Sequence, residues 1–170
     1  MIGSGVFSSI APVSKGAQGV LPNISVVRST ALGIFSSQLL RPKDSVTFCN
    51  LFVQLFFSRM GYNGFKGMLA SDMVRFARSS GDFLQVGIRV AISAAVAGQP
   101  SFAGLEGSPH GHVCVLLDST PSFSQRFDQM VPHCVDVGKN YRWDVPVSFA
   151  FRSMPEFFIL RRGFTKTKAP

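Results

Sequence analysis

Acidic residues are scarce in this chain of 170 residues. It holds 9 Asp and Glu against 17 Lys and Arg, which gives a formal net charge of +8 and a pI near 10.0. Only 15% of the residues are charged, whereas 46% are hydrophobic. This balance excludes an intrinsically disordered protein, which needs low hydrophobicity and dense charge, and it excludes a long charged coiled coil.

The chain also lacks the signals of a disulfide-rich or membrane-spanning protein. Its cysteines, Cys49, Cys114 and Cys134, are odd in number and widely spaced, so we expect reduced, buried thiols in an intracellular protein. No stretch reaches the roughly 18 uncharged apolar residues that a membrane span needs. The nearest candidate, 86–97, is short and contains Arg89. We therefore expect no membrane span.

Tyrosine and tryptophan are rare as well, with 2 and 1 residues against 17 phenylalanines. Phenylalanine fills volume without forming a hydrogen bond, so this bias suits a thick core or a surface buried between subunits. A chain that is apolar, basic and sparsely charged would expose an unfavourable surface as a free monomer. We therefore expect partner molecules to cover part of it.

Residues 1–44 show no sustained periodicity and contain several Gly and Pro residues. We predict an extended amino-terminal arm here, with at most a short strand near 24–27. The arm has no acid before Asp44, a composition shared by organelle transit peptides and by flexible arms of assembly proteins. After it, apolar residues at 48, 51, 52, 55 and 56 recur at helical spacing and predict one short helix.

From residue 61 onward the chain shows the spacing of strands and turns. The polar stretch 121–129 predicts a long connection. There is neither an alternating βαβ pattern nor an internal repeat. Alternating apolar residues predict strands at 84–92, 113–117, 135–137, 141–151 and 157–160. The expected fold is all-β: an antiparallel β-sandwich such as a jelly roll, spanning 45–170 and ending in a basic tail.

Candidate catalytic and metal-binding residues are few. His110, His112 and His133, with Cys114, could form a zinc site, but structural zinc sites usually show closer paired spacing. Adjacent residues of a strand face opposite sides, so His133 cannot easily activate the thiol of Cys134. We find no catalytic constellation, no metal site and no cofactor motif, and we expect that the chain is not an enzyme.

Short motifs in the chain resemble those of picorna-like virus capsid proteins. The segment 149–162 is similar to the last jelly-roll strand of that family, with Glu156 and Phe157 in the place of its acid–Phe pair. The segment 50–66 is similar to the family's short helix and the aromatic-rich strand after it. Residues 130–133 are similar to its hydrophobic-Pro-Tyr segment.

The resemblance implies a structural role. A picorna-like capsid protein associates with other copies or sister proteins into an icosahedral shell around genomic RNA, in a virion assembled in the host cytoplasm. Non-specific contacts with RNA phosphates are expected from the basic residues of the arm, Lys15, Arg28, Arg41 and Lys43. Contacts between subunits are expected at Phe52, Phe56, Phe157, Arg161 and Arg162.

Two other functions fit the same sequence. One is a basic structural subunit of a large organelle complex, such as a mitochondrial ribosome or a respiratory assembly, in which the arm is a targeting segment. The other is a zinc- or ligand-binding β-barrel enzyme that uses His110, His112 and His133. Loss of the arm from the mature protein would favour the first, and bound metal would favour the second.

Overall fold

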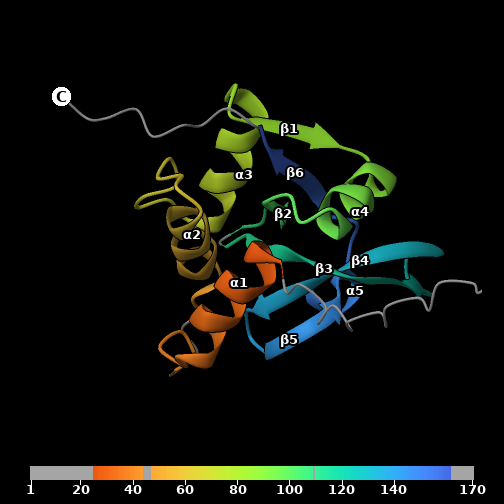
Figure 1. Cartoon of the computed structure of the whole chain (residues 1–170), viewed down its shortest axis with the longest axis horizontal. Coiled ribbons are helices and arrows are strands. Elements are labelled where there is room, and N and C mark those ends of the chain that lie inside the picture. The colour runs from red at the N-terminus through yellow and green to blue at the C-terminus, as the bar shows by residue number, and fades with distance from the viewer. Residues whose placement is uncertain (1–24, 44–46, 109, 162–170) are drawn as a thin grey trace, which may run out of the picture.

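The computed structural model describes residues 25–43, 47–108 and 110–161. All of its strands lie in a 6-stranded antiparallel sheet with the order β1-β6-β2-β3-β4-β5 (Figure 1). The strands are β1 Phe83–Val86, β2 Ser101–Leu105, β3 His112–Ser124, β4 Gln129–Val137, β5 Tyr141–Pro146 and β6 Glu156–Leu160. The prediction of a fold rich in antiparallel strands is therefore confirmed in its coarse form.

In the described part of the chain, helices rather than a second sheet cover both faces of this sheet (Figure 1). The first face carries α1 Val26–Ser36, α2 Cys49–Arg59 and α3 Ala70–Ser79. The second face carries α4 Ile88–Val96 and the single turn α5 Val147–Ala150. A sandwich of two sheets is thus not confirmed, and the expectation of a single short helix is wrong.

Alternation along β3 divides the interior into two cores. Val113 and Val115 point to the side of α1, α2 and α3, whereas Cys114 and Leu116 point to the side of α4 and α5. Because the side chains of a strand alternate between faces, a strand covered on both sides is apolar at every position. The unbroken apolar run 113–117 reflects this double burial.

The region 84–92, predicted as one strand, is instead β1 followed by α4. The pairing of β1 with β6 ends at Val86. The buried residues of α4, Ala91, Ala94 and Ala95, recur at helical spacing, and their small side chains allow the helix to lie close to the sheet. Larger apolar residues alternate over the same segment, at 84, 86, 88, 90 and 92. This alternation predicted a strand and hid the helical spacing of the alanines.

Two further helices occupy segments predicted to be irregular or extended. In α3, buried Ala70, Met73, Val74 and Ala77 follow the i, i+3, i+4, i+7 spacing of one helix face. The arm prediction is wrong for Val26–Ser36, because these residues form α1. Residues 1–24 of the predicted arm lie outside the described residues.

Ser25 accounts for the start of α1. Its hydroxyl accepts a hydrogen bond from the Arg28 backbone N–H at 3.1 Å, which is the usual contact of a helix N-cap. Val27, Ala31 and Ile34 then bury one face of the helix against the sheet. These three residues recur at helical spacing, so packing of one face against the sheet stabilises α1.

Two strand boundaries also differ from the prediction. The stretch 121–129 is not a long connection, because it completes β3, turns at 125–128 and begins β4. In 141–151 the strand ends at Pro146, where α5 follows. Proline cannot donate to a strand ladder, which explains this end. The last predicted strand is confirmed as β6.

Phenylalanines fill the interior of the chain. The ring of Phe57 packs edge-to-face on Phe65, Phe83 and Phe102 at centroid distances of 5.4, 5.6 and 5.9 Å. The expected subunit contacts Phe52, Phe56 and Phe157 are only 1%, 0% and 3% exposed. They belong to the chain's own cores, where little of their surface is left for a contact with another subunit. None of the described helices is long and apolar enough to span a bilayer.

Candidate active site

Cys49 is the first residue of α2. The orientation of this helix is set by Phe52, Val53 and Phe56, which are buried against the sheet, and the Phe52 N–H donates to the Phe48 carbonyl at 2.9 Å. The side chain of Cys49 is buried, with the residue 5% exposed. Because Cys49 opens the helix, its N–H and those of the next residues have no carbonyl of an earlier helical turn to bind.

His112, the first residue of β3, binds Asp136 of the neighbouring strand β4. Its Nε2 lies 3.1 Å from Asp136 Oδ1. The Asp136 side chain is 4% exposed, and the Gly138 backbone N–H donates to the same oxygen at 3.1 Å. The carboxylate is therefore held by two donors, and Nδ1 is the nitrogen of the imidazole that remains to face another group.

The thiol of Cys49 and the imidazole of His112 lie close enough for each group to shift the pKa of the other. Burial raises the pKa of the thiol, but the hydrogen bond and charge of His112, with backbone N–H groups of Val113 and Asn50, lower that pKa below its ordinary value. Burial lowers the pKa of His112, but Asp136 and Cys49 outweigh it and raise this pKa to about 10. The lowered pKa of the thiol and the raised pKa of the imidazole both favour the thiolate–imidazolium form of the pair.

Two neighbours restrict the imidazole of His112. A Cβ added at Gly138 would lie 2.7 Å from His112 Cε1, a distance shorter than any real contact of a Cβ. The ring of Phe151 packs on the imidazole at a centroid distance of 5.1 Å. Both neighbours limit rotation of the ring, so His112 stays directed towards Cys49 and Asp136.

A pocket of about 560 Å³ opens beside Cys49. Its walls come from the start of α2, the start of α3 and the loop between β2 and β3, and they include Thr47, Asn50, Leu69, Ser71, Arg75 and His110. The Asn50 side-chain amide donates to the Met68 carbonyl at 3.1 Å, which ties α2 to the segment before α3. Cys49 itself is one of the residues that line this pocket.

The loop between β2 and β3 lies close against the start of α3. The Ser71 hydroxyl is 3.3 Å from the Gly107 carbonyl oxygen, to which it donates, and it accepts the Gly107 N–H at 3.4 Å. At Gly111 a Cβ would lie 2.6 Å from both the Leu105 carbonyl oxygen and Ser71 Oγ. Only glycine fits such a close approach of two backbones, and this approach forms one wall of the pocket.

A second polar cluster joins α1 to β3, β4 and β5. Arg28 donates to Asp144 Oδ2 at 2.5 Å, and His133 lies 2.9 Å from Asp144 Oδ1 and 2.7 Å from Ser122 Oγ. Arg28, expected to face nucleic acid, is thus engaged inside the chain. His133 and His112 belong to separate clusters, so the structure does not assemble the three-histidine site. No group of three His, Cys, Asp or Glu among the described residues is arranged to hold a metal ion.

The other predicted contact residues lie on the surface or outside the described part. Arg41 is exposed and packs its guanidinium 5.5 Å from the centre of the Tyr141 ring, and Lys43 is exposed. Arg161 is exposed, and its backbone N–H donates to the Asp82 carbonyl at 2.9 Å. Lys15 and Arg162 lie outside the described residues. Among the described residues of this set, Arg41, Lys43 and Arg161 do not line the pocket beside Cys49.

Sequence reasoning singled out His112 only as a possible zinc ligand and did not connect it with Cys49 and Asp136, because no short motif contains the three residues. Their available signals are weak ones: a cysteine at the predicted start of a helix, a histidine that opens an apolar strand, and an acid inside the next strand. A cysteine nucleophile is usually paired with a histidine and an acid or amide that are distant in sequence. Only the packing of α2 on β3 and β4 brings the three together.

The sequence matches no protein-family model and has no significant match among curated proteins.

Proposed function

We propose that the chain is a cysteine-dependent hydrolase or acyltransferase acting on an amide or ester. The observation that carries this proposal is the juxtaposition of three groups: His112 is hydrogen-bonded to Asp136 and interacts with Cys49, and Cys49 lines a pocket. A thiol, an imidazole and a carboxylate in this order are the parts of a nucleophilic triad, which occurs on unrelated folds and is recognised by geometry rather than by sequence position.

Each group has a role that follows from its surroundings. The Cys49 thiolate attacks the acyl carbon, and the oxyanion that forms lies near the backbone N–H groups at the start of α2. His112, as imidazolium, gives its proton to the leaving amine or alcohol, and a thioester to Cys49 remains. Neutral His112 then takes a proton from water or a second acceptor, which attacks the thioester and releases the acyl group. Asp136 orients the ring and stabilises its charge.

The proposal is tested by the reactivity of Cys49 at acid pH. Iodoacetamide at pH 6, followed by mass spectrometry of the alkylated peptides, should modify Cys49 at least about tenfold faster than a free thiol, because only a lowered pKa provides thiolate at this pH. Cys114 and Cys134, which do not line the pocket and are 1% and 0% exposed, serve as controls in the same chain. A Cys49 that reacts no faster than a free thiol would contradict the proposal.

The capsid function predicted from the sequence is a second proposal. It is supported by β6, which forms where the resemblance expects a final strand, and by the excess of positive charge. A jelly roll would need a second sheet, and the phenylalanines expected between subunits are buried in the chain. Sedimentation and electron microscopy of the purified protein test it: closed shells support a capsid subunit, and a stable monomer at micromolar concentration opposes it.

A further inference from the structure

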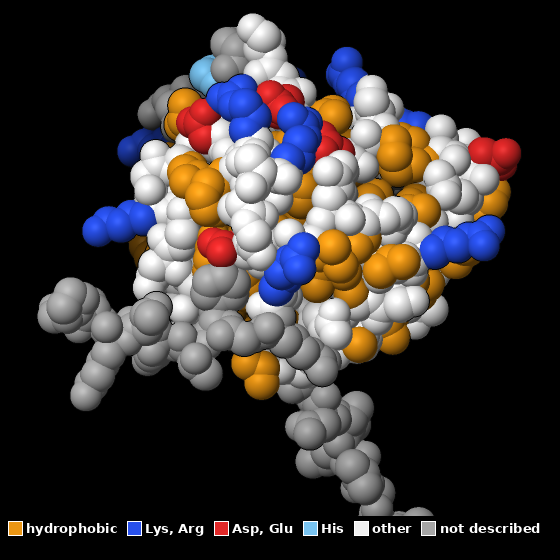
Figure 2. Space-filling model, turned by 90° about the horizontal axis from the view of Figure 1, so that it is seen from above, with side chains coloured by type: hydrophobic (Ala, Val, Ile, Leu, Met, Phe, Trp, Pro, Cys, Tyr) orange, Lys and Arg blue, Asp and Glu red, His pale blue; other side chains and the backbone are white. Residues whose placement is uncertain are grey.

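The arginine ion pairs of the described residues fall into two groups that differ in burial. Arg75 of α3 pairs with Asp72, and their side chains are 56% and 46% exposed. In Figure 2 the largest group of acidic side chains lies against basic ones on the surface. The second group is centred on Arg28 and Asp144, whose side chains are only 29% and 24% exposed. It differs further in that its carboxylate also binds a histidine and a serine.

Ser122, His133 and Asp144 are hydrogen-bonded in series. Ser122 Oγ lies 2.7 Å from His133 Nε2, and His133 Nδ1 lies 2.9 Å from Asp144 Oδ1. A carboxylate only accepts, so the proton of a neutral imidazole lies on Nδ1 and Nε2 accepts the hydroxyl of Ser122. A hydroxyl, a base and an orienting acid in this order are the groups that activate a serine as a nucleophile.

The other partners of Asp144 keep its carboxyl ionised. Arg28 donates to Oδ2 at 2.5 Å, and the Ser119 hydroxyl donates to Oδ1 at 2.6 Å. Hydrogen bonds from Ser119, Arg28 and His133 outweigh burial and hold the pKa of Asp144 below its ordinary value. An ionised Asp144 stabilises the imidazolium that forms when His133 takes a proton.

Irregular strand pairing brings these side chains together. The register of β3 on β4 shifts directly before Ser122. The register of β4 on β5 shifts as well, so that Trp143 and Asp144 lie opposite the single residue Val135. Asp144 has a φ of 54°, which few residues other than glycine adopt. Bulges of this kind redirect side chains and are over-represented next to active sites.

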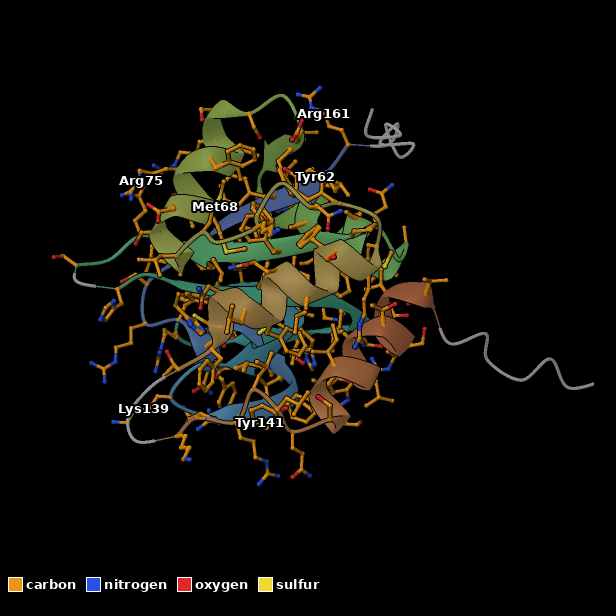
Figure 3. All side chains as sticks on the ribbon, turned by 90° about the vertical axis from the view of Figure 1, so that its left-hand side faces the viewer. Tyr62, Met68, Arg75, Lys139, Tyr141 and Arg161 are labelled. Carbon is orange, nitrogen blue, oxygen red and sulfur yellow. The ribbon has the colours of Figure 1, made fainter. Side chains whose placement is uncertain are left out.

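The serine series is separate from the proposed cysteine site. None of its three residues lines the pocket beside Cys49. Figure 3 shows Arg75, which lines that pocket, above α2, and Tyr141, the first residue of β5, below it. The side chain of His133 is 16% exposed and Ser122 is partly exposed, so the series is not sealed inside the core.

We propose that Ser122, His133 and Asp144 form a second nucleophilic site, which hydrolyses carboxylic esters. Ser122 Oγ attacks the ester carbonyl carbon while its proton passes to His133 Nε2. The imidazolium gives this proton to the leaving alcohol, the C–O bond breaks and an acyl-serine remains. His133 then takes a proton from water, which attacks the acyl carbon, and the released acid leaves Ser122 protonated again.

An ester fits this site better than an amide. An alcohol leaves more readily than an amine, and a partly exposed site excludes less water than a closed one. The inference is independent of the cysteine chemistry, because it rests on a different set of residues and contacts.

The test uses diisopropyl fluorophosphate at neutral pH, followed by mass spectrometry of the peptides. Ser122 Oγ forms a bond to phosphorus, the P–F bond breaks and fluoride leaves, and the hydroxyl proton passes through His133 to water. Ser119 is the control in the same chain, because it donates to Asp144 and not to the imidazole. We expect Ser122 to be labelled at least about tenfold faster than Ser119. Equal labelling, or no adduct on Ser122, would overturn the proposal.

His133→Ala separates a base from a structural residue. Labelling of Ser122 should fall at least about tenfold, and added imidazole should restore part of it, because a free base replaces the missing ring. Circular dichroism checks the fold of the variant. Full labelling of Ser122 in folded His133→Ala would contradict the proposal. If the variant does not fold, the ratio of Ser122 to Ser119 labelling in the wild type decides.

Ester hydrolysis itself is measured with p-nitrophenyl acetate in a Cys49→Ala background, so that the proposed cysteine does not contribute. Ser122→Ala should lower the rate at least about tenfold. The matched control is Ser93→Ala in α4, where an exposed hydroxyl donates to the Arg89 carbonyl, and it should leave the rate unchanged. Equal rates in the two variants would overturn the serine site without bearing on the reactivity of Cys49, so the two failures are distinguishable.

Discussion

The Nε2 atom of His112 lies 3.1 Å from Oδ1 of Asp136, which also accepts the Gly138 N–H. We predict that Asp136→Asn keeps the fold, because the amide has the same shape, and lowers the alkylation rate of Cys49 at pH 6 at least about tenfold. An amide provides no negative charge to stabilise the imidazolium. Unchanged circular dichroism with unchanged alkylation would contradict the role of this carboxylate.

The pH dependence of Cys49 follows from the two shifted groups. Its pKa is lowered, so the alkylation rate should rise at a lower pH than that of an ordinary thiol, and His112→Ala should move the rise up towards the ordinary range of a thiol, near 8.5. Because the pKa of folded His112 is raised to about 10, its contribution to stability is complete below about 6.5 and is lost as pH rises through about 10. Alkylation rates measured between pH 5 and 11 test the pKa of Cys49. Urea unfolding over the same pH range tests the contribution of His112 to stability.

Gly138→Ala tests the position of the imidazole. The new Cβ would lie 2.7 Å from His112 Cε1, so the ring or the turn must move, and Cys49 should lose most of its reactivity at acid pH. The matched control is Gly81→Ala, where a Cβ would meet nothing within 4 Å. If both variants keep wild-type alkylation rates, the turn does not position His112.

Asp144→Asn should destabilise the chain by about 1–3 kcal/mol, since it weakens hydrogen bonds to Arg28 and His133. Burial raises the pKa of Asp144, but Ser119, Arg28 and His133 outweigh it and keep that pKa below its ordinary value. The contribution is therefore present at neutral pH and is lost as pH falls through the folded-state pKa. Chemical unfolding at pH 7 and at pH 3 measures both effects.

Asp128→Asn is the control for this prediction. Asp128 and Asp144 both have a positive φ, 50° and 54°, which Asn tolerates, so both substitutions preserve the backbone. Asp128 has no hydrogen-bond or ion-pair partner among the described residues. Equal losses of stability in the two variants would show that the Arg28 cluster does not hold α1 on the sheet.

Phe56→Ala should reduce stability by about 3–5 kcal/mol even in a dilute monomer, because the ring is fully buried inside the chain. Phe149→Ala removes a side chain of a residue that is 61% exposed and should cost less than about 1 kcal/mol. Thermal unfolding of the two variants at several protein concentrations compares their losses of stability. A loss for Phe56→Ala that depends on protein concentration would point instead to a contact between copies.

Sequence patterns identified the elements in which the apolar residues follow a single period, that of a helix or that of a strand. Phe52 and Phe56 marked α2, and the run 113–117 marked part of β3. Patterns failed where two periods overlap, as at α4, whose buried alanines lie among larger alternating residues. The triad could not be predicted for a different reason: Cys49, His112 and Asp136 are neighbours only because α2 packs across β3 and β4, and long-range packing leaves no short motif in the sequence.

The close approach of the β2–β3 loop to Ser71 also has a consequence for inhibitor discovery. A rigid wall beside a nucleophilic sulfur is suited to irreversible ligands, because a chloroacetamide fragment bonded to Cys49 can be extended along the cleft towards Arg75. Cys114 and Cys134 are enclosed between the sheet and the helices on its second face. They should therefore not react with the chloroacetamide group. Fragment tethering thus offers a route to selective chemical probes of this chain.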